Sequence, residues 1–421
     1  MAVYADREHF IPLQLRDLID FLADGKAAKT PTRTLAGAEA TPFRRFAELV
    51  QAHYHGAFHQ KFRDLKESYA HFDPDTDTPS LSPLPEHERE AYLKNLYQEV
   101  RTLMQKANYR ELTREETMRV MQGSSLWGLE MDVAWDVFDH LDIFYRGDTT
   151  GVRTIRRWWK LWRKEDKVVP EFNRLMLILK QRPHKRLGKA ADTKSVYLKM
   201  FKDMPKPDLE MVLPGTKVML SGFDKGMIVY PIASGLAIVL YKILANVIGF
   251  TDIFALGVSV SLSWSLAVAF AGYSYKSYVS YSNKKTSYTL QLTQSLYYQM
   301  IDSNAGVFHR VLQEAEEQES REVILCYYYL WKVGGPNGLT DRELDDLVER
   351  ELEDRLGVKV DFEIADAMHK LETLGLVKAD AGRYRAVSLD QAVAAVEQGA
   401  AGAAKQTTGW ALLDRLAGKV I

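Results

Sequence analysis

The chain has 421 residues, with 55 Lys and Arg against 56 Asp and Glu, so its formal net charge is -1. At ~100 to 200 residues per domain this length indicates two to four packed units, and the balanced charge excludes a globally basic nucleic-acid coat or a globally acidic tail protein. The single cysteine, Cys326, excludes a disulfide framework and a metal cage of several thiolates.

The region 1–78 is predicted to be helical. Its start, Met1–Phe10, lacks an apolar stretch, so a secretory signal peptide is not expected. Apolar residues then follow with helical spacing, first between Leu15 and Leu22 and again from Phe43 to Tyr69. Four prolines between Asp73 and Pro85 end this unit.

The region 79–222 is expected to be a small α+β module. Helices are predicted over His87–Asn108 and Thr113–Met121, the second opened by a capping box of Thr113 and Glu116. Apolar and β-branched runs predict strands. The predicted strands are His140–Tyr145, Phe172–Lys180, Val196–Phe201 and Lys217–Leu220, with a short helix at Met204–Met211.

A basic, tryptophan-rich segment lies inside this module. Between Gly151 and Lys189, thirteen Lys and Arg residues stand against three acidic residues, a net charge of +10. Cations beside indole rings suit the headgroup zone of an anionic membrane. Nucleic acid would also accept this pattern, and a solvated helix with core tryptophans is the structural alternative. The residues expected at a lipid surface are Arg156, Arg157, Trp158, Trp159, Trp162, Arg163 and Lys164.

Two apolar runs, Met227–Gly249 and Phe254–Tyr275, dominate the hydropathy of the chain. Each exceeds the ~20 residues that cross a bilayer as a helix, so a transmembrane helical hairpin is expected over 226–275. A buried hairpin in a soluble core and a β-hairpin are the alternatives. Lys242 and Asn246 would be intramembrane polar residues, and the lysine lies near enough to the end of its run for the ammonium to approach the interface.

Residues around and within the hairpin predict its orientation and its self-association. Three lysines precede it, three follow it, and the connection between the two runs has none, so both termini are expected in the cytoplasm. Small residues alternate with large ones in the second run, and on a helix they form stripes that allow close packing against a second copy. These helix-packing residues are Gly257, Ser259, Ser261, Ser263 and Ser265. A homo-oligomer is therefore expected.

The rest of the chain is predicted to form three units: a helical connector at 276–320, a winged-helix-like domain at 321–388, and an Ala/Gly-rich tail with a short amphipathic helix at 389–421. Thr340 and Glu343 form a second capping box. Between Thr340 and Val377, twelve acidic residues outnumber five basic ones, which would repel phosphate. A protein partner is expected for this domain, and a nucleic acid is not.

Few residues lie at spacings typical of catalytic or metal-binding motifs. His55 and His59 lie four residues apart on a predicted helix, a spacing at which two imidazoles can share one metal ion. The aromatic residues around them are typical of a packed helix, so they are weak metal candidates. Motifs of hydrolases, nucleotide-driven enzymes and dinucleotide-binding enzymes do not occur in the sequence. We expect no cofactor, name no catalytic residue and leave enzymatic activity open without favouring it.

Five segments carry a resemblance to a known family: REHFIP (Arg7–Pro12), FHQKF…FDPDTD (Phe58–Asp77), YRGD (Tyr145–Asp148), FKDMPKPDLEMVLPGTKV (Phe201–Val218) and YYQMIDSNAGVFHRVLQEAEEQE (Tyr297–Glu319). On these segments the chain resembles the family of uncharacterised membrane proteins that includes mitochondrial transmembrane protein 143. The resemblance implies cytosol-side or matrix-side domains around a membrane hairpin. It implies no assigned activity and no catalytic residue.

The fold expected is mainly α with a small α+β module, a two-helix transmembrane hairpin and a C-terminal winged-helix-like domain. The expected function is an interaction or regulatory platform anchored in the lipid bilayer. A bacterial inner membrane is favoured over a mitochondrial one because the start lacks an acid-free, Arg-rich leader. The alternatives are a lipid-related enzyme with an unrecognised site near Tyr145–Asp148 and Phe201–Asp208, and a small oligomeric membrane conduit.

Overall fold

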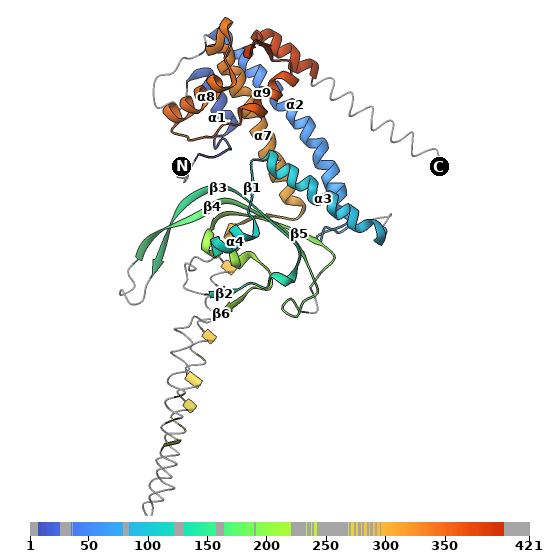
Figure 1. Cartoon of the computed structure of the whole chain (residues 1–421), viewed down its shortest axis with the longest axis vertical. Coiled ribbons are helices and arrows are strands. Elements are labelled where there is room, and N and C mark those ends of the chain that lie inside the picture. Colours follow the sequence, from blue (N-terminus) through green and yellow to red (C-terminus); the bar gives the residue numbers. More distant parts are fainter. Residues whose placement is uncertain are drawn as a thin grey trace, which may run out of the picture.

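The computed structural model describes residues 7–25, 35, 37–78, 84–121, 130–156, 164–188, 191–219 and 296–399, with scattered helical positions between 233 and 294. An antiparallel sheet and its covering helices form one half of the described chain, and a winged-helix-like unit forms the other (Figure 1). Two long helices, α2 (Gly37–Ala70) and α7 (Ala305–Tyr329), run through both halves.

The larger sheet has five antiparallel strands in the order β1-β3-β4-β5-β7. The bounds are β1 Arg110–Glu111, β3 Phe138–Arg156, β4 Lys164–Gln181, β5 Val196–Pro205 and β7 Met300–Ser303. β3 and β4 pair from Phe138↔Gln181 to Arg156↔Lys164, whereas the pairing of β4 with β5 stops at Glu171↔Pro205. Beyond that point β3 and β4 continue as a two-stranded ribbon that projects from the sheet (Figure 1).

The two faces of this sheet pack against different layers because successive side chains of a strand point to opposite faces. Met176 and Ile178 lie on the face covered by α2, α3 and α7. Leu175 and Leu177 lie on the other face, which α4 and the 3-10 helix η3 cover. The smaller elements of this half are α3 (Glu86–Lys106), α4 (Arg114–Met121), η1 (Trp135–Val137), η3 (Lys206–Val212), and a second, two-stranded sheet of β2 (Glu130–Asp132) and β6 (Lys217–Met219).

The second unit, called winged-helix-like here only for its order of helices followed by a β-hairpin, begins at the end of α7. Its elements are the π-helix η4 (Leu330–Gly334), η5 (Gly335–Asn337), α8 (Asp341–Leu356), α9 (Ile364–Thr373), and the hairpin of β8 (Val377–Asp380) and β9 (Arg383–Ala386). The Thr340 hydroxyl accepts from Glu343 N, and the Glu343 carboxylate accepts from Thr340 N, which confirms the predicted capping box. Helix α1 (Leu15–Asp24) and a helix at 389–399 pack on the same core.

Helices α2 and α7 lie antiparallel and join the two cores. Near the winged-helix-like unit, the rings of Phe46 and Tyr327 are 4.4 Å apart between centroids. Near the sheet, those of Tyr69 and Phe308 are 5.2 Å apart. Because α7 runs without a break through residue 320, where a domain boundary was predicted, one helix fixes the spacing of the two cores.

A buried ion cluster fixes α9 on α7. Lys370 Nζ lies 2.6 Å from a Glu319 oxygen and 2.5 Å from an Asp366 oxygen, and it also contacts Glu322. Burial acts to lower the pKa of Lys370, but the carboxylates of Glu322 and Glu319 outweigh it and raise that pKa. Within the described residues these three carboxylates are the one group spaced closely enough to hold a metal. Lys370 supplies the cation that they surround.

The transmembrane hairpin predicted over 226–275 is not supported and is corrected here. Among the described residues, no helix combines the length and apolar character needed to cross a bilayer. The described fold is helical with a five-stranded antiparallel sheet. The prediction rested on apolar run length, which by itself does not separate a span from other apolar segments. The expected integral location in a bacterial inner membrane, with cytoplasmic termini, is corrected with it, and most of 226–275 lies outside the described residues.

Local predictions agree better with the structure. The four predicted strands coincide with parts of β3, β4, β5 and β6, and the two predicted helices of the module with α3 and α4. Thr113 and Glu116 form the capping box expected of them. The helix expected over 276–320 is interrupted by β7, because Ser303 and Asp302 pair with Lys199 and Met200 of β5.

Replacing Lys370 with Met should leave the Glu322 and Asp366 carboxylates without their cation and Glu319 with only Lys106, 3.8 Å away. We expect the free energy of unfolding at neutral pH to fall by about 3 to 5 kcal/mol, and the loss should shrink in acid, where the carboxylates become neutral. Urea unfolding followed by circular dichroism measures both. The exposed Lys378→Met variant serves as control and should change stability by less than about 0.5 kcal/mol. A similar loss in both variants would contradict the role assigned to the cluster.

Candidate protein-binding surface

Helix α8 carries most of the acidic charge of the winged-helix-like unit. Leu344, Val348, Leu352 and Leu356 recur every four residues and are buried, so the intervening positions face outward. The helix contains eight acidic and three basic residues. Four acidic side chains of α8 and α9 are exposed and make no ion pair with another described residue: Asp341, Asp346, Asp354 and Glu372.

The electrostatic effect of this clustering is visible at Asp345. Burial, and then the negative charges of Glu349 and Asp346, raise the pKa of Asp345 to about 6. Its Oδ1 is buried without a hydrogen-bond partner in the described part of the chain. The acidic potential of α8 is therefore not fully neutralised inside the molecule.

One flank of α8 is covered by an N-terminal strap, defined here as Arg7–Ile11. Arg7 Nη1 lies 2.9 Å from Glu349 and Nη2 lies 2.7 Å from Glu353, and Nη1 also donates to the carbonyl of Val360 at 3.0 Å. The backbone of Glu8 accepts from Asp361 N at 2.9 Å. The strap thus neutralises this flank and leaves the outward positions of α8 acidic.

The other side of the strap contacts the five-stranded sheet. Asp148 N donates to Glu8 Oε1 at 2.8 Å, and the Arg146 guanidinium lies 4.7 Å from the centre of the Phe10 ring. Arg146 also pairs with Glu314 of α7 at 2.7 Å. The strap therefore ties the winged-helix-like unit to the sheet.

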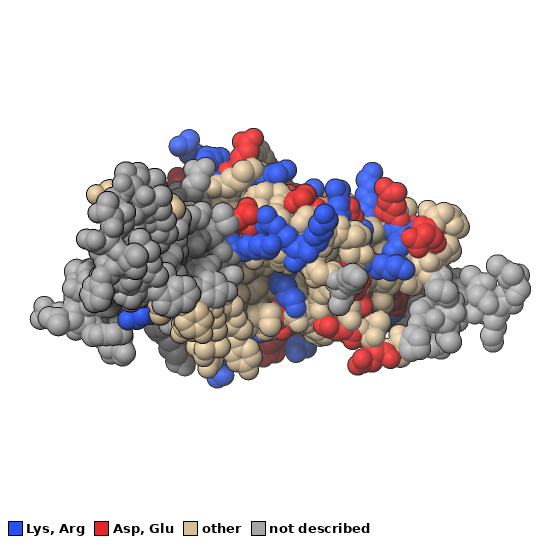
Figure 2. Space-filling view, turned by 90° about the horizontal axis from the view of Figure 1, so that it is seen from below, with Lys and Arg blue, Asp and Glu red and all other residues tan. Residues whose placement is uncertain are grey.

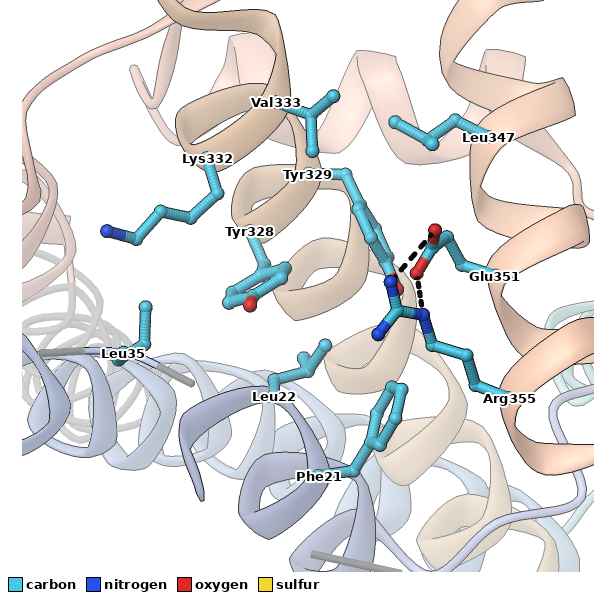
Figure 3. A pocket seen from close by; sticks show the side chains of 10 residues that line it. All are labelled: Phe21, Leu22, Leu35, Tyr328, Tyr329, Lys332, Val333, Leu347, Glu351 and Arg355. Carbon is cyan, nitrogen blue, oxygen red and sulfur yellow. Dashed lines mark hydrogen bonds and ion pairs between the residues drawn. The ribbon is translucent and has the colours of Figure 1, made fainter. Parts of the chain in front are cut away.

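The opposite flank of α8 borders a pocket of about 790 Å³. Leu347, Glu351 and Arg355, each one turn from the next, form its α8 wall, and Glu351 pairs with Arg355 beside the Tyr329 ring (Figure 3). The other walls come from α1, residue 35, α7 and η4, and consist of Phe21, Leu22, Leu35, Tyr328, Tyr329, Lys332 and Val333. These walls are mostly aromatic or aliphatic, but most of the surface that the pocket exposes is polar, so the pocket suits a side chain with both apolar and polar parts.

Several basic side chains of the winged-helix-like unit are engaged internally, whereas Arg342, Arg350, Lys359 and Lys378 are exposed. The one lysine of α9, Lys370, is held in the buried cluster, and Arg383 and Arg385 pair with Glu343 and Asp380. Phosphate binding needs accessible cations in excess of acidic groups, and the exposed acidic side chains of α8 and α9 oppose it. On the far side of the molecule, viewed from below in Figure 2, Lys and Arg are intermingled with Asp and Glu over the described surface.

The structure places the sequence-predicted site residues as follows. His55 and His59 line a groove between α2 and α7, with ring centroids 6.2 Å apart. Arg156 and Lys164 pair with each other in the ribbon of β3 and β4, so the segment is extended there and not helical. Outside the described residues lie Arg157, Trp158, Trp159, Trp162 and Arg163, Lys242 and Asn246, and Gly257, Ser259, Ser261, Ser263 and Ser265.

Sequence reasoning missed the strap and the pocket. The segments REHFIP and YRGD were both noted for the family resemblance, yet nothing in their spacing indicated that Glu8 would meet Asp148 or that Phe10 would meet Arg146. The pocket combines residues from α1, α7 and α8. Residues this far apart in sequence leave no periodic signal that a single sequence can show.

A comparison with known protein families gives a match. A family described as "Protein of unknown function (DUF3754)" matches residues 143–306, which include most of β3, all of β4, β5 and η3, and the start of α7. The match supports a domain of unknown function; it provides no link to the family that includes transmembrane protein 143 or to membrane proteins. No solved structure matches the chain.

The Asp345→Asn variant should be more stable than the parent chain at neutral pH. A raised carboxyl pKa means that folding disfavours the charged form, and this cost is present above the folded pKa of about 6 and disappears below the ordinary value. Allowing for solvent screening, we expect a gain of about 1 kcal/mol near pH 7.5 and little difference near pH 4. Urea unfolding at both pH values measures it. Asp354→Asn, on the exposed side of α8, is the control and should change little; a gain that does not depend on pH would contradict the assignment.

Proposed function

We propose that this chain is a protein-binding platform whose winged-helix-like unit binds a basic segment of a partner protein. The observation that carries the proposal is the position of a pocket with a mixed apolar and polar lining on the flank of an acidic helix. Leu347 belongs to the pocket wall, while Asp346 and Asp354 of the same helix are exposed. A single segment lying along α8 can therefore reach both features.

The chemistry of the surface defines the partner. A side chain buried in the pocket would provide most of the affinity, because buried anchors at the centre of an interface dominate its energetics. Lys or Arg residues opposite Asp346 and Asp354 would increase the association rate and the specificity. The 16 residues of α8 span about 24 Å, so an amphipathic helix of similar length matches the surface.

The contacts that hold α8 and α9 in place suit a binding surface. The strap holds one flank of the helix to the sheet, and the Lys370 cluster holds α9 to α7. A surface fixed in this way binds without a large ordering cost. The family that includes transmembrane protein 143, which this chain resembles, has no assigned activity. The resemblance therefore gives no reason to prefer an enzymatic function over binding.

A binding experiment on the full chain tests the proposal. The probe is a fluorescent helical peptide of Leu and Lys, about 18 residues long to give five turns, followed by fluorescence anisotropy. Combining Asp346→Lys with Asp354→Lys should weaken binding about tenfold and reduce its salt dependence. Leu347→Arg should weaken binding by obstructing the pocket, with the salt dependence retained. Glu115→Lys on α4, an exposed charge reversal outside the surface, is the matched control.

The outcomes separate the possibilities. If the α8 variants bind the peptide as the parent does, or if Glu115→Lys weakens binding equally, α8 is not the binding surface. If duplex DNA of equal charge binds more tightly than the peptide, the protein-partner assignment is wrong. Circular dichroism of each variant confirms that the fold is retained.

An enzyme in the sheet module is a second candidate, favoured by one observation. In η3, burial and then the charge of Asp208 raise the pKa of Glu210 to about 7, a value suited to a general acid or base. Lys206 of the same element pairs with Asp148 at 2.6 Å. A hydrolase screen comparing the parent with Glu210→Gln tests this alternative, and activity that the variant retains would reject it.

A further inference from the structure

The strap is held against the winged-helix-like unit in the manner of a bound peptide. Glu8 forms a parallel bridge with Val360, and the carbonyl of Glu8 accepts from Asp361 N at 2.9 Å. Next to it, Arg7 directs its guanidinium at two carboxylates of α8. Many peptide-binding proteins combine backbone pairing with a polar site for one side chain in this way.

The two carboxylates that bind Arg7 border the surface proposed for the partner. Glu349 and Glu353 follow Asp346 by three and seven residues, so at about 100° per residue they lie within about 60° of it around the helix axis. Asp346 is exposed. A basic segment that contacts Asp346 is therefore within side-chain reach of the position that Arg7 occupies.

Other contacts help to hold the acceptors of Arg7 in place. Glu349 Oε1 accepts from Phe362 N at 3.0 Å, while Oε2 of the same carboxylate lies 2.9 Å from Arg7 Nη1. The carbonyl of Val360, which also accepts from Arg7, belongs to the connection between α8 and α9. A cation from another molecule would therefore meet acceptors that the protein itself positions.

Arg7 is held less firmly than the apolar end of the strap. Its side chain is 40% exposed, whereas Phe10 is 8% exposed and Ile11 is 1% exposed. Ion pairs in contact with solvent contribute little to stability, because water screens them, and buried apolar side chains contribute more. Arg7 can therefore exchange with another cation while Phe10 and Ile11 keep the strap attached.

We propose that Arg7 is an internal competitor of the partner, and that a Lys or Arg of the bound segment takes its place at Glu349 and Glu353. The inference rests on the proposed function and adds to that surface the flank of α8 that the strap covers. An internal competitor reduces the apparent affinity in proportion to the fraction of molecules whose site is open. A segment without a cation at this point gains nothing by displacing Arg7, so the strap also selects against neutral partners.

Peptide titration of Arg7→Ala in the full chain tests the inference. The probe is the fluorescent helical peptide of Leu and Lys, followed by anisotropy. Arg7→Ala should bind it about threefold to tenfold more tightly than the parent chain does, because the two carboxylates become available. The matched control is Arg119→Ala, which removes an exposed arginine of α4 and changes the net charge equally. It should bind as the parent chain does.

A further set of variants separates competition from a general effect of charge. In a chain that carries Glu349→Gln and Glu353→Gln, adding Arg7→Ala should no longer tighten binding, because the carboxylates that it would release are gone. The amide oxygen introduced at position 349 can still accept from Phe362 N. Circular dichroism confirms that each variant is folded.

The outcomes distinguish this inference from the function on which it rests. Equal binding by the parent chain and Arg7→Ala overturns the competition and leaves the α8 surface intact. A gain that persists without the two carboxylates, or that Arg119→Ala reproduces, reflects net charge and also overturns it. Binding by Arg7→Ala but not by the parent chain supports it, since the competitor then blocks the site completely. If neither chain binds the peptide, both proposals are wrong.

Discussion

The antiparallel contact between α2 and α7 is the constraint on which the rest of the described structure depends. At 34 residues, α2 is about 50 Å long, which exceeds what one small core can cover. Its first half therefore packs in the core of the winged-helix-like unit and its second half in the core above the sheet, with α7 alongside throughout. The strap, the histidine groove and the buried lysine cluster all lie along this pair of helices.

Charge is distributed unevenly around that pair. Inside, each cation meets carboxylates: Lys370 among Glu319, Glu322 and Asp366, and Arg146 beside Glu314. Breaking such a buried pair costs more than forming it contributes, so these contacts specify one arrangement more than they add stability. The acidic residues left on the outer side of α8 have no comparable partner among the described residues, and this makes them available to another molecule.

The sequence predicted the features that depend on residues close together in the chain. Capping boxes at Thr113 and Thr340 were visible because two residues three positions apart define them. Strands were visible as short apolar runs, although the ribbon was not, since its strand segments at 149–156 and 164–170 are largely polar or charged and lack the alternation of a half-buried strand. The membrane hairpin was wrong because apolar length was its main support.

The candidate sites were visible only in part. The spacing of His55 and His59 follows from one helical turn, but Glu316 lies 261 residues away and only packing brings it to His55. The same holds for the strap, whose Arg7 and Glu349 are 342 residues apart. Contacts of this kind depend on how the helices pack against each other. A single sequence contains no periodic pattern that shows which distant segments are in contact.

The distance along the chain between α2 and α7 also bears on how the protein is made. About 270 residues separate Val50 from Val323, yet both belong to one core. At ~5 to 20 residues per second of synthesis, the apolar face of α1 and α2 would wait roughly 15 to 55 s on the ribosome before its partner emerges. During that interval the nascent N-terminal helices expose the surface that chaperones bind, so the production of this protein in cells should depend on chaperone capacity more than its final stability suggests.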